Sequence, residues 1–302
     1  RVLRAVQKLG YSPNVNARSL ATGQTHTLGI VVPDIANPYW SQVFLGMQSV
    51  ALREGYTFSL FSSDHDDANV KGLVEALVDK RVDGLLLAVG IYDNDLVRML
   101  RTYRIPVVFM SPPSESIPWD CVHTDDETGS YDATKHLIEL GHRCLGMISG
   151  NSQDLASQLR VNGFMRATRE AGLDASPEYL VEGNWRINGG EIAGRKLLSL
   201  PQPPSAVMTA NNATAVGLIK AGRALGIRIP EDLAIATFGD LGLATELFPF
   251  ITTVITDAYA SGTLAVQLLL NRIQGIGPTS SQIVCIQHRL RPGVDNQTCE
   301  EV

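Results

Sequence analysis

The sequence has little cysteine and no long apolar run. Four cysteines occur in 302 residues, and no two of them form a C-x-x-C pair. Scattered cysteines predict free thiols in a reducing compartment rather than a disulfide framework or a zinc site. No uninterrupted apolar stretch approaches the roughly 20 residues that a membrane-spanning helix needs. These absences argue against a secreted or membrane-anchored protein and favour the cytoplasm, although a cleaved signal peptide would leave no trace.

The motifs of the common enzyme classes are also missing. The chain has no phosphate-binding loop, dinucleotide fingerprint, HExxH motif or GxSxG elbow. The segment 146–150 (GMISG) resembles the elbow only loosely, because its spacing is wrong. The six histidines show no metal-ligand spacing. We therefore expect no catalytic residue, no metal and no cofactor, and a function in binding rather than catalysis.

Acidic residues are absent from the first 25 positions. This segment carries four basic residues, whereas the whole chain has 25 basic and 31 acidic residues. A basic end on an acidic body favours a polyanion as the partner of that end, and a solvated basic tail is the alternative. The chain does not begin with Met and opens inside an amphipathic pattern at Val2, Val6 and Leu9. We therefore expect an upstream part of the protein to precede it.

From residue 27 onward, short apolar runs alternate with segments of helical periodicity. Leu28–Val32 predicts a buried strand, and Asn37–Pro38 predicts the N-cap and first position of a helix. The same rhythm restarts after residue 124. Repeated β-α units predict a parallel sheet with helices on both faces. Two successive units in a chain of this length predict an α/β protein with two doubly wound lobes, whose ligand cleft lies at the facing carboxyl ends of the strands.

Short motifs follow one another in a fixed order along the whole chain. They are GYSPN at 10–14, ARSL at 17–20, GIVVPD at 29–34, NPY at 37–39, VDG at 82–84, IPV at 105–107, LGHR at 140–143, RVNGF at 160–164, GIRIPED at 226–232 and TTV at 252–254. Each motif is weak alone, but their order and spacing resemble the lactose/galactose repressor (LacI/GalR) family. The resemblance implies a bacterial transcription regulator with a helix-turn-helix head, a hinge helix and a two-lobed effector domain like periplasmic sugar-binding proteins.

The resemblance also divides the chain into parts. The first two helices of the head are missing, so the recognition helix of the major groove should be absent. We expect residues 1–25 to hold a remnant of the head and the hinge helix. Residues 26–124 and 254–283 should form the first lobe, and residues 125–253 and 284–302 the second.

The hinge motif implies a contact with DNA. Residues 14–22 (NVNARSLAT) can form a short helix, which alone would be marginal in water. In the family this helix becomes ordered in the minor groove, and Leu20 matches the leucine that wedges between base pairs. Packing of Leu20 onto the lobe is the alternative. The DNA-binding residues implied by the resemblance are Asn14, Ala17, Arg18 and Leu20.

The resemblance further implies an effector site in the cleft. Tyr39 and Trp40 match aromatic residues that face the ligand ring, and Trp185 matches an aromatic wall on the second lobe. Arg160 matches an arginine that anchors the ligand. The alternatives are a core position for Trp40 and an interlobe salt bridge for Arg160. The expected ligand-binding residues are Tyr39, Trp40, Ser111, Arg160, Trp185, Arg186, Asn211, Gly239 and Asp257.

Two departures from the family pattern favour an anionic effector. Ser111 and Gly239 stand where the family commonly has aspartates, while Arg160 is retained and Arg186 is nearby. A ligand carboxylate would therefore escape strong like-charge repulsion. We expect a six-carbon sugar acid, gluconate or 2-ketogluconate, because some members that sense such acids share an ending like RPG at 291–293. We expect Arg160→Ala to abolish binding with little change in melting temperature.

These observations predict an effector-controlled transcription repressor that is a homodimer and whose partners are operator DNA and a small molecule. The helix that bears Phe44 and Met47, or its neighbour with Val70 and Val74, should contribute apolar surface to a two-fold interface in addition to covering the sheet. A periplasmic-type solute-binding protein for a sugar or sugar acid is the alternative. That class has the same lobes but gives no reason for a basic hinge.

Overall fold

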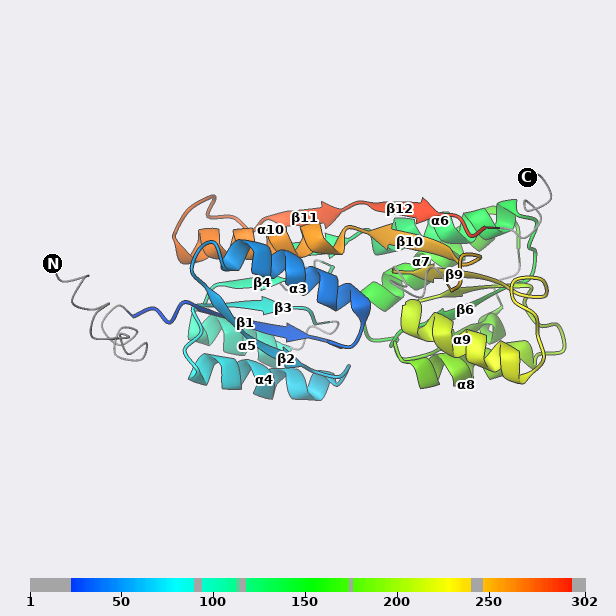
Figure 1. Ribbon diagram of the computed structural model, residues 1–302, viewed down its shortest axis with the longest axis horizontal. Helices are drawn as coiled ribbons and strands as arrows, with labels where there is room; N and C mark the ends of the chain where they lie inside the picture. The colour runs from blue at the N-terminus through cyan, green and yellow to red at the C-terminus, as the bar shows by residue number, and fades with distance from the viewer. Residues whose placement is uncertain are drawn as a thin grey trace, which may run out of the picture.

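The computed structural model describes residues 23–89, 94–112, 114, 118–173, 176–239 and 247–294. These residues form two α/β lobes that lie side by side along the long axis of the molecule (Figure 1). Each lobe contains one six-stranded sheet. The fold class expected from the alternating pattern, two parallel-sheet lobes, is confirmed.

The first sheet has the strand order β11-β5-β4-β3-β1-β2, and all of its pairings are parallel. Helices α3 (Pro38–Ala51) and α10 (Ala258–Ile273) pack on one face, and α4 (Asp67–Asp79) and α5 (Asn94–Tyr103) on the other. The strands are β1 (Thr27–Val32), β2 (Thr57–Ser62), β3 (Gly84–Leu87), β4 (Val107–Phe109), β5 (Asp120–Thr124) and β11 (Ile283–Ile286).

The second sheet has the order β12-β10-β9-β8-β6-β7, and only the pairing of β10 with β12 is antiparallel. Helices α6 (Asp126–Glu139) and α7 (Leu155–Glu170) cover one face, and α8 (Ile187–Leu198) and α9 (Asn212–Ala224) the other. The remaining elements are β6 (Leu145–Ser149), η1 (Pro177–Tyr179), β7 (Leu180–Glu182), β8 (Ala206–Thr209), β9 (Ala234–Phe238), β10 (Thr252–Thr256) and β12 (His288–Arg291).

Over the described residues, the chain crosses between the lobes three times: between β5 and α6, between β10 and α10, and between β11 and β12. β10 pairs with β9 of the second sheet, so the return to the first lobe falls near Asp257 rather than at residue 254. β11 pairs with β5 of the first sheet, so the final crossing falls near Gln287 rather than at residue 284. Short apolar strands do not show which sheet they join, because their partners are distant in the sequence.

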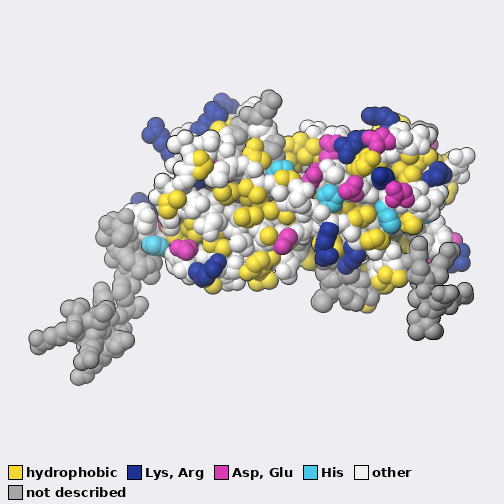
Figure 2. All heavy atoms as spheres, turned by 90° about the horizontal axis from the view of Figure 1, so that it is seen from above, with side chains coloured by type: hydrophobic (Ala, Val, Ile, Leu, Met, Phe, Trp, Pro, Cys, Tyr) yellow, Lys and Arg dark blue, Asp and Glu magenta, His cyan; other side chains and the backbone are white. Residues whose placement is uncertain are grey.

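The two helices considered for a two-fold interface cover the sheet of the first lobe, as expected. Met47, Val70 and Val74 are at most 4% exposed and belong to its core. Phe44 is partly buried and packs against Phe58. Hydrophobic side chains nevertheless gather over the first lobe on the face shown in Figure 2, whereas charged side chains are mixed over the second lobe. No described helix is long and apolar enough to span a bilayer.

Candidate functional site

A cleft lies between the lobes, at the carboxyl ends of the parallel strands of both sheets. It has a volume of about 940 Å³ when its open mouth is included. Its walls come from the loops after β1 to β5 and the start of α10 in the first lobe, and from the loops after β6 to β9 in the second. Strand ends in doubly wound sheets are the usual position of a ligand site, because the loops there bring side chains together from many elements.

Most of the residues expected at the ligand site line this cleft. They are Tyr39, Trp40, Ser111, Arg160, Trp185, Asn211 and Gly239. Arg186 lies in an adjoining hollow at the mouth. Asp257 is exposed, and its carboxylate accepts a hydrogen bond from the backbone N–H of Ala260, 2.8 Å away, at the N-cap of α10. Asp257 is not part of the described lining of the cleft. The expected DNA-binding residues Asn14, Ala17, Arg18 and Leu20 lie outside the described residues.

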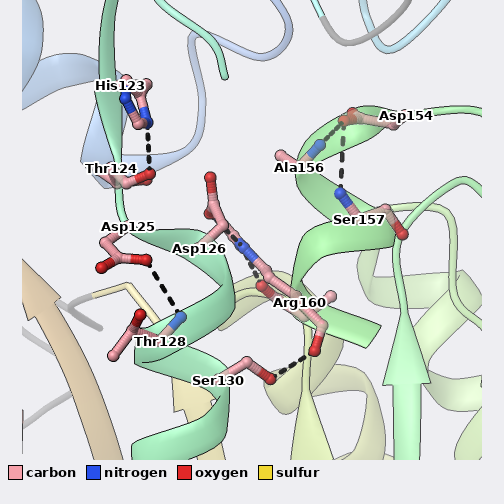
Figure 3. Close-up of polar contacts among 11 residues, drawn as sticks. His123, Thr124, Asp125, Asp126, Thr128, Ser130, Asp154, Ala156, Ser157 and Arg160 are labelled. Carbon is pink, nitrogen blue, oxygen red and sulfur yellow. Dashed lines mark hydrogen bonds and ion pairs between the residues drawn. The ribbon is translucent and has the colours of Figure 1, made fainter. Parts of the chain in front are cut away.

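The central polar group of the cleft is an ion pair between Arg160 on α7 and Asp126 on α6 (Figure 3). The Nε and Nη2 atoms of Arg160 lie 2.8 and 2.7 Å from Oδ1 of Asp126, whose side chain is 2% exposed. Nη1 donates to the backbone carbonyl of Ala210. Both partners belong to the second lobe, so the interlobe salt bridge considered for Arg160 is not what the structure shows.

Two aromatic rings lie against the guanidinium of Arg160. Its Cζ lies 3.8 Å from the ring centroid of Phe238 and 5.1 Å from that of Trp185. Such contacts between a cation and aromatic faces favour a flat, fixed guanidinium. Arg160 therefore has a structural role in the second lobe in addition to the ligand contact expected from the sequence.

The cleft contains two carboxylates that the sequence pattern did not reveal. Burial raises the pKa of Asp126, while Arg160, Thr124 and His123 lower it. Burial also raises the pKa of Asp154 to about 6, although the hydrogen bonds from the backbone N–H groups of Ala156 and Ser157 lower it. The expectation of a cleft depleted of buried carboxylates was therefore wrong. Ser111 and Gly239 do line it, but the starts of α6 and α7 supply acids from other positions.

Both acids lie at the start of a helix, which explains why the sequence pattern did not identify them as cleft residues. Asp154 is the N-cap of α7, and Asp126 follows the N-cap Asp125 in the first turn of α6. Acids at these positions usually stabilise the helix by accepting backbone N–H groups and complementing its dipole. Nothing in the local sequence distinguishes such an acid from one that also faces a cleft.

The first-lobe wall of the cleft is aromatic. Tyr39 and Trp40 make an edge-to-face contact with ring centroids 5.0 Å apart. Burial raises the pKa of Tyr39 to about 12, so its phenol remains protonated and able to donate a hydrogen bond at neutral pH. Trp40 packs against the core cluster of the first lobe as well as lining the cleft, which combines the two roles considered for it.

Asn211 holds the opposite wall in place. Its Oδ1 accepts from the backbone N–H of Thr214 at 2.9 Å and completes a capping box at the start of α9. Its Nδ2 donates to the carbonyl of Trp185 at 3.0 Å. Both the oxygen and the nitrogen of this side-chain amide therefore have hydrogen-bond partners within the second lobe. We interpret Asn211 as a residue that positions Trp185.

Three further contacts cross the mouth of the cleft. Arg186 donates to the backbone carbonyl of Asp64 and lies 3.3 Å from its carboxylate. The ring of His65 stacks on Trp185 with centroids 6.5 Å apart. Asn212 Nδ2 and Asn37 Oδ1 are 3.3 Å apart. Asp64 and His65 were not expected at the site, because the loop between β2 and α4 carries no motif.

Two parallel-sheet lobes around such a cleft define a protein of the periplasmic-binding-protein type. Residues 25–290 match the family model described as periplasmic binding proteins and sugar binding domain of LacI family. The chain therefore belongs to the LacI family of transcription regulators. Its relatives include the HTH-type transcriptional repressor PurR of Aliivibrio salmonicida, 32% identical over 91% of this chain and 83% of the relative.

Solved structures agree with this assignment. The transcription regulator CcpA of Lactococcus lactis superposes with a TM-score of 0.79, 25% identity, and coverage of 88% of this chain and 97% of that one. The complex of the transcriptional regulator CelR with cellobiose has a TM-score of 0.79, 28% identity, and coverage of 96% and 88%. The relatives named here are transcription regulators rather than enzymes.

Proposed function

We propose that this chain is the effector-sensing part of a cytoplasmic transcription repressor that binds operator DNA through its N-terminal head and hinge. The cleft carries the proposal, because its polar and aromatic groups come from both lobes. A ligand held between the lobes stabilises one relative position of the lobes over others. The resulting change in hinge geometry would alter DNA affinity, with a coupling of typically 1–3 kcal/mol in such systems.

The anchor of the hinge supports this route. The described chain enters the first lobe at the end far from the second lobe (Figure 1). There the carboxylate of Asp83 accepts the backbone N–H groups of Thr25 and His26, each at 2.8 Å. The Thr25 hydroxyl donates to the same carboxylate at 3.0 Å. The last residues before β1 are thus bound to the first lobe, so they move with it when the cleft closes or opens.

A dimer would convert this movement into a change of distance between two hinges. The exposed apolar side chains of two adjacent helices support such a dimer. They are Leu45 on α3, Leu52 at its C-cap, and Tyr259 and Leu264 on α10, which are 37% to 57% exposed. Association of two copies would remove this surface from water.

We propose a six-carbon sugar acid as the effector, with its carboxylate on Arg160 and its carbon face on Trp185 or on the Tyr39–Trp40 pair. Arg160 supports this class because a guanidinium has five N–H groups. Asp126 and the Ala210 carbonyl accept from only some of them. The aromatic walls suit the carbon face of a sugar.

The ion pair favours a second class, a neutral sugar. Asp126 already neutralises Arg160, and Asp154 adds a further carboxylate whose pKa of about 6 leaves it ionised at pH 7.5. These two acids would repel a ligand carboxylate and accept hydrogen bonds from sugar hydroxyls. The cellobiose complex of CelR shows a relative with a neutral sugar.

Calorimetry at two pH values separates these two classes. We would titrate the protein with gluconate, 2-ketogluconate, glucose, galactose and cellobiose at pH 7.5 and 5.5. Protonation of Asp154 at the lower pH reduces repulsion. A sugar-acid effector should therefore gain affinity relative to the neutral sugars on acidification. Selective binding of a neutral sugar would refute the proposal of a sugar-acid effector but would agree with the proposed sensing function. If none of the five compounds binds, both effector classes are contradicted.

A further inference from the structure

Two loops face each other across the mouth of the cleft, and both have an unusual backbone. In the loop between β2 and α4, Asp64 and His65 have φ values of 53° and 54°. In the loop between β7 and α8, Asn184 and Trp185 have values of 51° and 62°. Residues other than glycine rarely adopt this left-handed region of φ, and a bulky residue such as Trp185 is an outlier there. Such conformations persist where the surroundings hold them, often at ligand clamps.

Side chains from these two loops meet in pairs. The rings of His65 and Trp185 are nearly parallel, with an interplanar angle of 14° and centroids 6.5 Å apart. Arg186 contacts Asp64 twice, once at its carbonyl and once at its carboxylate. Each of these contacts joins one lobe to the other, so a separation of the lobes would break it.

His65 also carries a buried polar atom without a hydrogen-bond partner among the described residues. This atom is Nε2. The residue lines both the cleft and the hollow at its mouth, so a ligand in the cleft lies within reach of the ring. An unpaired buried imidazole nitrogen is costly. Because Nε2 is buried in this structure, a ligand hydroxyl reaches and satisfies it only when the ring or its loop moves.

We propose that His65 is a recognition group for a hydroxyl of the effector. With Trp185, Asp64 and Arg186 it also forms a latch that holds the lobes together over the ligand. The recognition part rests on the proposed function, since it requires an effector in the cleft. The latch is a property of the protein alone and can be tested without a ligand.

The charges around His65 determine how the latch responds to pH. Burial and the nearby Arg186 lower the pKa of His65, while Asp34 and Asp64 raise it, and the net direction is downward. Asp154 faces the same hollow from the second lobe. The ring is therefore neutral at pH 7. Protonation would place a second cation beside Arg186 in a buried position, so the latch should weaken as the pH falls through the lowered pKa of His65.

The test is the pKa of His65 in the whole chain, measured by NMR of the histidine rings and assigned with His65→Gln. In Asp64→Asn the two possible roles of Asp64 predict opposite signs. If Asp64 is only a nearby negative charge, its removal lowers the pKa of His65 further. If it holds the latch, its removal lets the loops separate, and the pKa rises toward the ordinary imidazole value as the ring becomes hydrated.

The matched control is Asp66→Asn in the same loop. Asp66 is the N-cap of α4, a role that asparagine also performs, and it makes no contact with the second lobe in the described structure. We expect no rise in the pKa of His65 in this variant. A pKa that falls or stays unchanged in Asp64→Asn overturns the latch, and so does an equal rise in both variants.

The recognition part is tested with the sugar and sugar acid panel. His65→Ala should weaken the member that binds best by roughly three- to tenfold, as expected for a lost hydrogen bond, whereas Asp66→Asn should not. Unchanged affinity in His65→Ala overturns recognition by His65. Failure of the whole panel to bind the unmodified protein overturns the effector class and recognition together. The titration of His65 still decides the latch in that case.

Discussion

Breaking the ion pair between Arg160 and Asp126 should strongly destabilise the second lobe. Arg160→Met leaves a carboxylate that is 2% exposed without its cation and removes the hydrogen bond to the Ala210 carbonyl. It also removes the stacking on Phe238 at 3.8 Å. Loss of one partner of a buried pair typically costs about 3–5 kcal/mol. For a chain of this size, that corresponds to a fall in Tm of roughly 6–20 °C. This replaces the expectation of an almost unchanged melting temperature.

Thermal and urea unfolding at pH 7.5 would measure the effect, with a double-mutant cycle to isolate the pair. Asp126→Leu combined with Arg160→Met should recover much of the loss, because apolar replacement of both partners leaves no buried charge. The control is Lys135→Met. Lys135 pairs with Glu139 at 3.8 Å, and both side chains are more than half exposed. Such a surface pair should change stability by no more than about 0.5 kcal/mol.

The pH dependence provides an independent check. Burial already raises the pKa of Asp126, and Arg160 opposes that rise. Without Arg160 the pKa of Asp126 rises further. A carboxyl group whose pKa is raised in the folded state loses stability as the pH rises through that value. Arg160→Met should therefore be more destabilising at pH 8 than at pH 5. A Tm within 1–2 °C of the unmodified protein at both pH values would refute the reasoning.

Four further predictions follow from other contacts. Because the pKa of Asp154 is raised from 3.8 to about 6, stability should fall by about 1–2 kcal/mol between pH 5 and 7.5, and Asp154→Asn, which keeps the N-cap of α7, should remove this slope in thermal unfolding. Asp83→Asn should speed amide hydrogen exchange at Thr25 and His26, and unchanged exchange would exclude the anchor. Leu45→Asp should shift a dimer toward monomer in light scattering, whereas Leu140→Asp on the second lobe should not. In protein with a complete head, Leu20→Ala should weaken operator binding and reduce DNA bending in gel mobility, and unchanged bending would exclude the wedge.

The apolar periodicity predicted many of the elements closely, because it is local. The pattern near 258–273 predicts a helix, and α10 has these bounds. The pattern near 126–140 also predicts a helix, and α6 spans Asp126–Glu139. Helix α8 was not expected, since Gly189 and Gly190 lower helix propensity in its first turn. The tertiary structure explains these glycines: a Cβ on Gly189 would lie 2.0 Å from the carbonyl oxygen of Gly183.

The site could be predicted only in part. Tyr39, Trp40 and Trp185 carry recognisable motifs, so their positions in the cleft could be expected from the family pattern. Asp126 and Asp154 look like ordinary residues at the starts of helices, and no local signal marks them as cleft residues. The unpaired Nε2 of His65 depends on packing from both lobes, which the sequence around His65 does not reveal.

The sequence by itself determined the alternation of strands and helices, the two lobes and the family. These properties depend on the spacing of apolar residues and on short motifs, which are visible within windows of 10 to 20 residues. Only the tertiary structure decided which charges meet. Asp126 and Arg160 are 34 residues apart, and Asp64 and Arg186 are 122 residues apart. The balance of charge in the cleft is the sum of such distant pairings. The residue types at single positions such as Ser111 and Gly239 therefore could not predict it.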